Sequence, residues 1–409
     1  MHLKHLSLAN FRNFVRLELD LPPTVTLLQG DNAEGKTNLL EAIALLSTAR
    51  SPRTTADREW LSWHADREPV PYARLEGVLE QEGEETRLEM VLVPTGNASA
   101  NGPTFRKQIL VNGLACRALD LVGTLKVVLF MPEDVDLVAG SPSARRRFLD
   151  IALCQVDRRY CRTLSRYLKV VERRNALLRQ LRESGGDAGQ LEFWDRELVQ
   201  SGSYLIARRW AVLARLDLHA GEVHGQVAGP EARLRLGYLS EVPLTGEGQP
   251  KVKRRSGPTS PAAALGDAAA VAQEQVADAF WQRLKGLRDQ ERGAGLTLVG
   301  PHRDDFQFLL AGKNLRAYGS RGQQRTAALA LRLAEVEVMK EETGQTPVLL
   351  LDDVMSELDR TRREYLLRVL DGAAQAIVTT TDWDDFAPAF RARVHRLKVE
   401  AGEVRQVAA

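Results

Sequence analysis

The sequence predicts a mixed α/β fold that is interrupted in the middle of the chain by a mainly α-helical lobe. The apolar run Val25–Gln29 ends at a glycine and precedes a helical pattern. Val348–Leu351 is apolar without alternation, which is typical of a strand buried in a parallel sheet. Between Arg145 and Gly286, apolar residues instead follow helical spacing. We therefore expect the α/β segments on either side to form one lobe, split in sequence.

The chain length supports this division. At 409 residues the chain is too long for one ordinary domain, and its 44% apolar content is enough for sizeable cores. We expect an α/β lobe made of residues 1–144 and 292–409, and a helical lobe made of residues 145–291. No apolar run of about 18 residues predicts a membrane helix. Met1–Asp20 lacks the apolar stretch of a signal peptide, so we expect a cytoplasmic protein with no membrane partner.

The N-terminal part is expected to contain strands and one helix. Alternating apolar residues predict strands, and turn residues after apolar runs predict hairpins. The expected elements are two strands within His2–Leu19, a strand at Val25–Gln29, a helix at Thr37–Leu46, a hairpin over Tyr72–Val93 that turns near Glu82-Gly83, and a hairpin that begins with Gln108–Val111.

The helical lobe is expected to begin with one helix over Arg145–Leu181, which carries a coiled-coil-like seam. The seam consists of Leu149, Leu153, Val156, Tyr160, Leu164, Tyr167, Val171, Leu178 and Leu181. Ser184-Gly185-Gly186 ends this helix. The later expected elements are helices over Gln190–Ala220 and Ala262–Gly286, a loop over Leu244–Pro261, a strand at Leu296–Val299, a helix over Arg321–Glu342, and strands at Val348–Leu351 and Ala376–Val378.

The strongest motif is a glycine-rich loop that fits G-x-x-x-x-G-K-[ST] and lies between a strand and a helix. It consists of Gly30, Asp31, Asn32, Ala33, Glu34, Gly35, Lys36 and Thr37, followed by Asn38. The glycines let successive N–H groups point at phosphate oxygens, at the positive end of the helix. Lys36 would reach the β- and γ-phosphates and assist catalysis, and the Thr37 hydroxyl would ligate Mg²⁺. The sequence therefore predicts ATP and Mg²⁺ as cofactors.

The second motif is the apolar strand Val348–Leu351 followed by two acids, the pattern of a Walker B strand. Asp352, at the carboxyl end of the strand, is expected to hold Mg²⁺. Asp353 is expected to orient or deprotonate the attacking water. Either acid alone could instead cap a helix, but the glycine-rich loop upstream favours the catalytic interpretation.

A third motif lies just before a helix, ahead of the Walker B strand. Gly319-Ser320-Arg321-Gly322-Gln323 is similar to the signature of ABC-type ATPases, whose phosphate-binding end faces the nucleotide of the other subunit. Taken alone, Ser320 could equally be a helix-capping serine. Ser320, Gly322 and Gln323 are the expected nucleotide contacts. Asp359, which ends Ser356-Glu357-Leu358-Asp359, resembles the D-loop residue of the same proteins.

Together these motifs closely resemble the RecF family of DNA-repair ATPases. The resemblance also rests on Asn10-Phe11-Arg12-Asn13-Phe14, Asn38-Leu39-Leu40-Glu41-Ala42-Ile43, Pro132-Glu133-Asp134, Gly140-Ser141-Pro142 with Arg145-Arg146, Gly300-Pro301-His302-Arg303-Asp304-Asp305 and LLLDDVMSELD. It covers the chain from end to end and is weakest between Gly185 and Gly295. It implies an ABC-type P-loop ATPase head of the Rad50 and SMC kind, split in sequence, with a helical lobe that lacks a long coiled coil.

The resemblance also implies a function. RecF-like proteins form ATP-dependent head-to-head dimers on DNA and act with RecR and RecO in loading recombinase at gaps. It thus implies slow ATP hydrolysis, a homodimer, and duplex or gapped DNA as a partner in the nucleoid. Asp353 stands where a Glu is usual, and Thr379, Thr380 and Thr381 stand where many ABC ATPases place a histidine. Both departures fit slow turnover, and Glu133 is one possible residue of the glutamine loop.

Two motif residues have two interpretations each. His302 lies in a Pro-His-Arg-Asp-Asp run after a predicted strand, where a capped turn with a local ion pair is favoured over a catalytic role. Arg12 could approach the nucleotide, as a similar Arg does in Rad50-like heads. Arg12 could equally be a polar residue of a strand turn.

Positive charge is concentrated in one segment, although the net charge of the chain is only +2. Ser141–Arg182 carries twelve Arg or Lys against three Asp or Glu, and Arg binds phosphate with a forked geometry. A solvated helix face is the alternative interpretation. The predicted DNA contacts are Arg158, Arg159, Arg173 and Arg174 on the helix, and Lys251, Lys253, Arg254 and Arg255 on the loop.

Other classes of site and function are less well supported. Cys116, Cys154 and Cys161 form no CxxC pair and are odd in number, which argues against a disulfide framework or a zinc site. The nucleotide-binding subunit of a membrane transporter would share the P-loop, but it has no role for an Arg-rich helical lobe. A small-molecule kinase would need neither a signature motif nor a D-loop.

Overall fold

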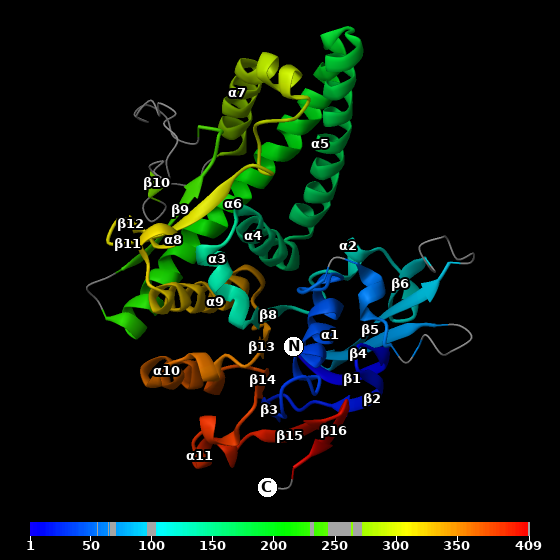
Figure 1. The fold of residues 1–409 in the computed structure, drawn as a ribbon, viewed down its shortest axis with the longest axis vertical. Helices are drawn as coiled ribbons and strands as arrows, with labels where there is room; N and C mark the ends of the chain where they lie inside the picture. Colours follow the sequence, from blue (N-terminus) through cyan, green and yellow to red (C-terminus); the bar gives the residue numbers. More distant parts are fainter. Residues whose placement is uncertain are drawn as a thin grey trace. The chain divides into compact units, whose positions relative to one another are not determined.

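The chain folds into two compact units, and its first and last parts belong to the same unit (Figure 1). The computed structural model describes residues 1–54, 56–63, 65, 71–95, 104–229, 233–243, 263–264 and 272–407. One compact unit consists of Met1–Glu133 and Met339–Ala409, and the other of Asp134–Val338. The predicted α/β fold with a mainly helical insertion is confirmed. Within the described part of the chain, no helix is long and apolar enough to cross a membrane.

The α/β unit contains two six-stranded sheets. The antiparallel sheet has the strand order β2 (Phe14–Asp20), β1 (His2–Phe11), β4 (Ala73–Gln81), β5 (Glu84–Pro94), β6 (Phe105–Val111) and β7 (Leu114–Ala115). The other sheet is parallel except for its first strand, and its order is β16 (Glu403–Gln406), β15 (His395–Glu400), β3 (Val25–Gln29), β14 (Ala376–Thr380), β13 (Val348–Leu351) and β8 (Val127–Phe130).

Helix α1 (Lys36–Thr48) packs against strands of both sheets. It is buried on nearly every side, as expected for a helix enclosed between two layers. Its N-terminus directly follows the loop after β3, so this packing fixes the position of the glycine-rich loop. The remaining elements of the unit are η1 (Asp57–Trp60), α2 (Ala118–Leu121), η5 (Met355–Glu357), α10 (Arg360–Asp371), η6 (Trp383–Asp385) and α11 (Pro388–Arg391).

The helical unit consists of long helices and a small antiparallel sheet. Helices α5 (Arg158–Ser184) and α6 (Leu191–Ala228) lie side by side (Figure 1), and Leu178, Leu181 and Leu191 form a core cluster near the end of α5. The sheet has the order β10 (Ala263–Ala264), β9 (Leu234–Leu239), β11 (Asp305–Leu310) and β12 (Lys313–Asn314). The other elements are α3 (Val135–Ala139), α4 (Pro142–Val156), η4 (Ala188–Gln190), α7 (Gln273–Ala294) and α8 (Leu315–Tyr318). The chain passes from one unit to the other within η3 (Pro132–Asp134) and α9 (Arg321–Thr343).

The prediction of one helix over Arg145–Leu181 is wrong, because Asp157 divides it into α4 and α5. Asp157 has an extended backbone, and its carboxylate caps α5 by accepting a hydrogen bond from the Tyr160 N–H at 2.8 Å. The same carboxylate accepts hydrogen bonds from the Tyr204 hydroxyl and the Arg208 guanidinium on α6, both at 2.9 Å. The apolar seam runs through this point without a gap, so the periodicity concealed the break.

Three further expectations differ from the structure. The helix expected over Ala262–Gly286 is α7, which begins at Gln273 and ends at Ala294. Residues 296–299 do not form a strand, because the Thr297 and Leu298 N–H groups donate to the side chains of Asn175 and Glu291. Residues 292–338 pack with the helical unit, since β11 pairs with β9, so the expected boundaries at 144 and 291 are displaced to 133 and 338. The predicted loop over residues 244–261, with its four basic residues, lies outside the described residues.

Candidate active site

The glycine-rich loop joins β3 to α1, as the sequence predicts, and its two glycines are required by close contacts. A Cβ atom on Gly30 would lie 2.5 Å from the Val399 carbonyl oxygen on β15. Gly35 has φ of +117°, and a Cβ atom there would lie 2.4 Å from the Asn13 side-chain nitrogen. Both fixed positions of the motif therefore require glycine, because a side chain at either one would collide with a neighbouring segment.

Neighbouring segments hold the loop in place. The Asn13 side-chain amide donates to the Glu34 carbonyl oxygen at 2.8 Å, and Asn13 Oδ1 accepts from the Asn38 side chain at 2.8 Å. The Glu34 carboxylate accepts from the Ala401 N–H. Asn13 and Ala401 thus hold the loop through Glu34, and Asn13 also contacts Asn38. Asp31, Asn32 and Ala33 are exposed at its tip.

The Lys36 side chain turns back onto the glycine-rich loop. Its Nζ donates to the carbonyl oxygens of Gly30 and, at 2.9 Å, of Asp31. Burial lowers the pKa of the Lys36 ammonium, against the opposing effect of the carboxylates of Asp353 and Asp352. The Lys36 ammonium is thus buried and held by two carbonyl oxygens of the loop itself.

Thr37 and Asp352 bring the two Walker motifs together. The Thr37 hydroxyl donates to the Asp352 carboxylate, with Oγ1–Oδ2 and Oγ1–Oδ1 distances of 2.8 and 3.0 Å. The two residues follow β3 and β13, between which β14 lies in the sheet. Hydroxyl and carboxylate oxygens are the ligands that Mg²⁺ prefers, so this donor pair fits the predicted metal. Neither acid caps a helix.

Asp353 adopts a left-handed backbone conformation with φ of 48°, which is uncommon for a residue other than glycine. Its Oδ1 is buried and has no hydrogen-bond partner among the described residues. Burial raises the pKa of the Asp353 carboxyl, although the Ser356 hydroxyl and Lys36 lower it. A carboxylate with one unengaged oxygen and raised basicity is suited to accept a proton from water.

Comparison with known proteins shows the family to which the whole chain belongs. The family model described as RecF/RecN/SMC N terminal domain matches residues 2–404. The DNA replication and repair protein RecF of Roseiflexus castenholzii is 44% identical, over 99% of each chain. The chain belongs to the RecF family. Its RecF relative in Herpetosiphon aurantiacus is 42% identical, over 98% of this chain and 99% of that one.

Solved structures agree with this assignment. The structure of the recombination mediator protein RecF with ATPrS in the RecFOR pathway is 32% identical and has a TM-score of 0.82, over 100% of this chain and 98% of that one. An Smc head domain with an extended coiled coil from Pyrococcus furiosus is 14% identical, covers 100% and 96% of the two chains, and has a TM-score of 0.51, which shows the fold alone. The resemblance to RecF and the SMC-like head fold are thus confirmed.

The signature motif of this RecF family member forms a capping box at the start of α9. Ser320 Oγ accepts from the Gln323 N–H at 3.3 Å, and the Gln323 side chain accepts from the Ser320 N–H at 2.9 Å. Ser320, Gly322 and Gln323 are exposed. The helix-capping interpretation of Ser320 is therefore correct, and the nucleotide contact stays a prediction.

Asp359 and Arg12 each have local partners. Asp359 caps α10 by accepting from the Arg362 N–H at 3.0 Å, and it also pairs with the Arg362 guanidinium at 2.8 Å. Arg12 lies in the turn between β1 and β2 and donates to both carboxylate oxygens of the buried Glu41, at 2.7 and 3.1 Å. The structure thus supports the strand-turn interpretation of Arg12. Nucleotide contacts of either residue remain predictions.

His302 is half-buried within the helical unit. Its Nε2 lies 3.3 Å from the Thr297 carbonyl oxygen, and its Nδ1 lies 2.7 Å from the Tyr167 hydroxyl. Burial lowers the pKa of His302 to about 4. The predicted turn is confirmed, but the ion pair is not local, because Asp305 pairs with Arg145 on α4 at 2.7 Å.

The prediction that Arg174 contacts DNA is wrong, because this side chain is fully buried. It donates to Asp195 Oδ1 at 2.8 Å, to Glu291 Oε2 at 2.6 Å and to Thr297 Oγ1 at 2.9 Å. Two carboxylates compensate the buried guanidinium, which makes Arg174 a structural centre of the helical unit. Arg158, Arg159 and Arg173 are exposed.

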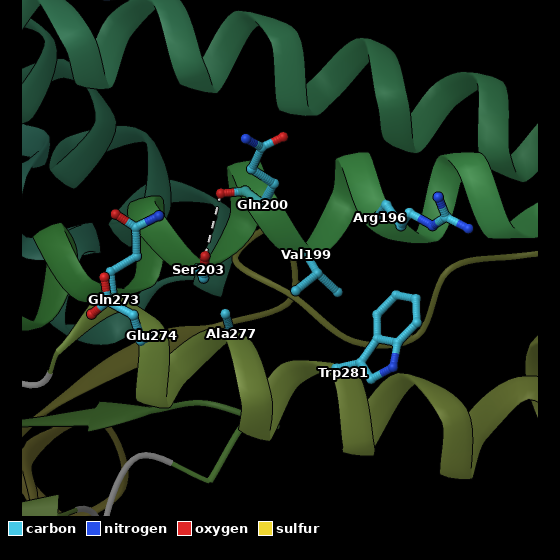
Figure 2. A pocket seen from close by; sticks show the side chains of 8 residues that line it. All are labelled: Arg196, Val199, Gln200, Ser203, Gln273, Glu274, Ala277 and Trp281. Carbon is cyan, nitrogen blue, oxygen red and sulfur yellow. Dashed lines mark hydrogen bonds between the residues drawn. The ribbon is translucent and has the colours of Figure 1, made fainter.

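Two other features take no part in the site. Cys116, Cys154 and Cys161 form no disulfide within the described part of the chain, and Cys161 is buried. A groove of about 370 Å³ lies between α6 and α7, with Arg196 and Trp281 toward one end and Gln273 and Glu274 toward the other (Figure 2). None of the predicted site residues lines this groove.

Sequence reasoning missed several residues that shape the site. Asn13 supports the loop, and Glu41 holds Arg12; both were noted only as parts of longer motifs. Thr379 was noted for the histidine it replaces, whereas its hydroxyl contacts both Walker B acids. Glu133 is exposed, and its assignment to a glutamine loop stays a prediction.

Proposed function

We propose that this protein binds DNA in an ATP-dependent manner in recombinational repair and hydrolyses ATP slowly. The contact of 2.8 Å between Thr37 and Asp352 carries the ATPase part of the proposal. It joins the P-loop and the Walker B strand at a point where Mg²⁺ would find suitable oxygen ligands. Gly30 and Gly35 let the backbone of this loop pack closely against Val399 and Asn13, which holds the loop beside that contact.

Individual residues of the α/β unit have separate roles in the proposed hydrolysis. Mg²⁺, when bound, supplies positive charge to the phosphates. Lys36 exchanges the Gly30 and Asp31 carbonyl oxygens for phosphate oxygens. Asp353 orients the attacking water through its unengaged Oδ1. Asp is one methylene shorter than the usual Glu, and the threonines at the carboxyl end of β14 supply no imidazole, which supports slow turnover.

The remaining half of the site comes from a second copy of the chain in this proposal. The capping box at Ser320 and Gln323 presents the positive end of α9, a 23-residue helix, in an exposed position. Such an end suits a γ-phosphate held by another copy. ATP thereby favours a head-to-head dimer that encloses duplex or gapped DNA, and hydrolysis releases it. RecR- and RecO-type proteins would then use the complex to load recombinase, in the cytoplasm at the nucleoid.

An exposed basic face of α5 is the proposed DNA contact. Its residues recur three or four positions apart, and they are Arg158, Arg162, Arg166, Lys169 and Arg173. Neighbouring acids are few, although Arg166 pairs with Glu197. Contacts to phosphate alone explain binding with little base specificity.

Anisotropy of a labelled duplex, measured with ATP over a salt series, tests the DNA contact. The log–log slope falls by about 0.9 for each phosphate contact removed. The test variant replaces Arg158, Lys169 and Arg173 with Gln, and the matched control replaces the exposed Arg360, Arg368 and Arg405 of the α/β unit. An unchanged slope in the α5 variant would contradict the assignment. Size-exclusion chromatography with and without ATP tests the dimer.

A further inference from the structure

Thr379 lies between the two Walker motifs, near the end of β14, and is fully buried. Its Oγ1 is 2.9 Å from Asp352 Oδ1 and 2.9 Å from the Asp353 backbone nitrogen. The Leu351 carbonyl oxygen is farther away, at 3.4 Å. One hydroxyl group therefore contacts both acids at the end of the neighbouring strand.

The direction of these hydrogen bonds is determined by chemistry. The Asp353 N–H can only donate, so Thr379 Oγ1 accepts its hydrogen. The hydroxyl has one hydrogen of its own, and the charged carboxylate at 2.9 Å is a better acceptor than the carbonyl at 3.4 Å. Thr379 thus donates to Asp352 Oδ1. Asp352 Oδ2 is left facing the Thr37 hydroxyl at 2.8 Å.

The same hydroxyl stabilises the backbone of Asp353. Its left-handed conformation is unfavourable for a non-glycine residue, so contacts must hold it. Thr379 binds the N–H of Asp353, and the Ser356 hydroxyl donates to the Asp353 carbonyl oxygen at 2.8 Å. Because threonine is branched at Cβ, few orientations of its hydroxyl are available.

We propose that Thr379 is a positioning residue that orients Asp352 Oδ2 toward the Thr37 hydroxyl and fixes the backbone of Asp353. This inference rests on the proposed function, in which Asp352 and Thr37 hold Mg²⁺. Partners that orient a metal ligand through its second oxygen contribute to metal affinity. Thr379 acts through Asp352 and Asp353, and the proposal assigns it no contact with ATP.

Thr380 offers a matched control for a merely structural hydroxyl. It follows Thr379 on β14 and is also fully buried. Its Oγ1 lies 2.9 Å from the Asp382 carbonyl oxygen and 2.9 Å from Asp385 Oδ2, and it makes no hydrogen bond with Asp352 or Asp353. Thr380→Val therefore removes a buried hydroxyl of the same strand without changing the support of either Walker B acid.

The experiment measures binding of a fluorescent ATP analogue in EDTA and over a Mg²⁺ titration, together with ATP turnover. In Thr379→Val the Mg²⁺ concentration for half-maximal turnover should rise about tenfold or more, whereas nucleotide affinity in EDTA should stay at the wild-type value. Thr379→Ser, which keeps the hydroxyl, should need far less Mg²⁺ than Thr379→Val. Thr380→Val should keep the wild-type Mg²⁺ requirement. If Thr379→Val does not fold, Thr379→Ala gives the same readout.

The outcomes distinguish a failure of the role proposed for Thr379 from a failure of the proposed function. A wild-type Mg²⁺ requirement in Thr379→Val, or equal loss of nucleotide affinity with and without Mg²⁺, would overturn the role of Thr379. Equal rises in Thr379→Val and Thr380→Val would overturn it too, because a general disturbance of β14 would then be the cause. If the wild-type protein itself shows no Mg²⁺-dependent ATP turnover, the proposed function fails instead.

Discussion

His302 makes a prediction about the pH dependence of the helical unit. The Thr297 carbonyl oxygen can only accept a hydrogen, so His302 Nε2 carries the proton and Nδ1 accepts from the Tyr167 hydroxyl. A second proton on Nδ1 would remove that acceptor in a buried position. This arrangement explains why burial lowers the pKa of His302 from 6.5 to about 4.

The change in folding stability with pH follows from the difference between the pKa of His302 in the folded and unfolded states. Between pH 6.5 and 4 the unfolded chain binds a proton at His302 and the folded chain does not, so folded-state stability falls as pH falls. Between pH 8 and pH 5 the loss amounts to about 2 kcal/mol. Asp304, whose pKa is raised to about 6 by burial, changes stability in the opposite direction. A comparison with His302→Gln, which cannot titrate, isolates the histidine.

Hydrogen exchange of amides in α5 and α6 measures the stability of this unit separately from the α/β unit. The stability of the wild type relative to His302→Gln should decrease by about 2 kcal/mol from pH 8 to pH 5. A difference that stays constant over this range would refute the assignment of a buried neutral imidazole, because an exposed histidine has the same pKa folded and unfolded.

Four other substitutions test the site and the core. Lys36→Met should lower ATP turnover by about 100-fold or more, since no other side chain of the loop supplies this charge; turnover at the wild-type rate would contradict the site. Ser320→Arg should leave ATP binding intact and prevent the ATP-dependent dimer, as seen by size-exclusion chromatography; a dimer that still forms would exclude the shared site. Asp353→Asn should retain ATP in a long-lived dimer, because Asp352 still holds Mg²⁺ while the water loses its carboxylate; inability to bind ATP would mean that the two acids have other roles. Arg174→Ala should destabilise the helical unit by about 3–5 kcal/mol, whereas the exposed neighbour Arg173→Ala should change it little; equal effects in urea denaturation would contradict the buried network.

Local sequence patterns predicted the α/β core of the site well. The loop from Gly30 to Thr37 is continuous in sequence, and its strand and helix are both marked by apolar periodicity. The Walker B acids follow a strand that is apolar at every position, Val348–Leu351. The elements β3, α1 and β13 were therefore predictable, because short-range pattern and local conformation coincide there.

The predictions that were wrong concern residues whose contact partners lie far away in the sequence. Arg174 lies four residues after Val170 and four before Leu178, on the buried side of α5, so the periodicity contained a signal against exposure. Its partners Asp195 and Glu291 lie on other helices, and nothing local reveals them. Asp157 likewise divides α4 from α5 with the help of residues on α6. Thr379 acquires its contacts only when β14 and β13 pair.

The order of strands in the parallel sheet has a consequence for synthesis of the chain. Strand β3 has β14 on one side and β15 on the other, so Val25 pairs with Ala376 and Thr26 with His395. Both edges of β3 therefore stay unpaired until the last strands have left the ribosome, and unpaired edges are open to association with other chains. The helical unit is continuous in sequence, from Asp134 to Val338. It can therefore fold while the ribosome is still making β14 and β15, the strand partners of β3. The glycine-rich loop is thus synthesised well before β14 and β15 and acquires its final support only after both strands have been made, so nucleotide binding at the proposed site would report that these strands are in place.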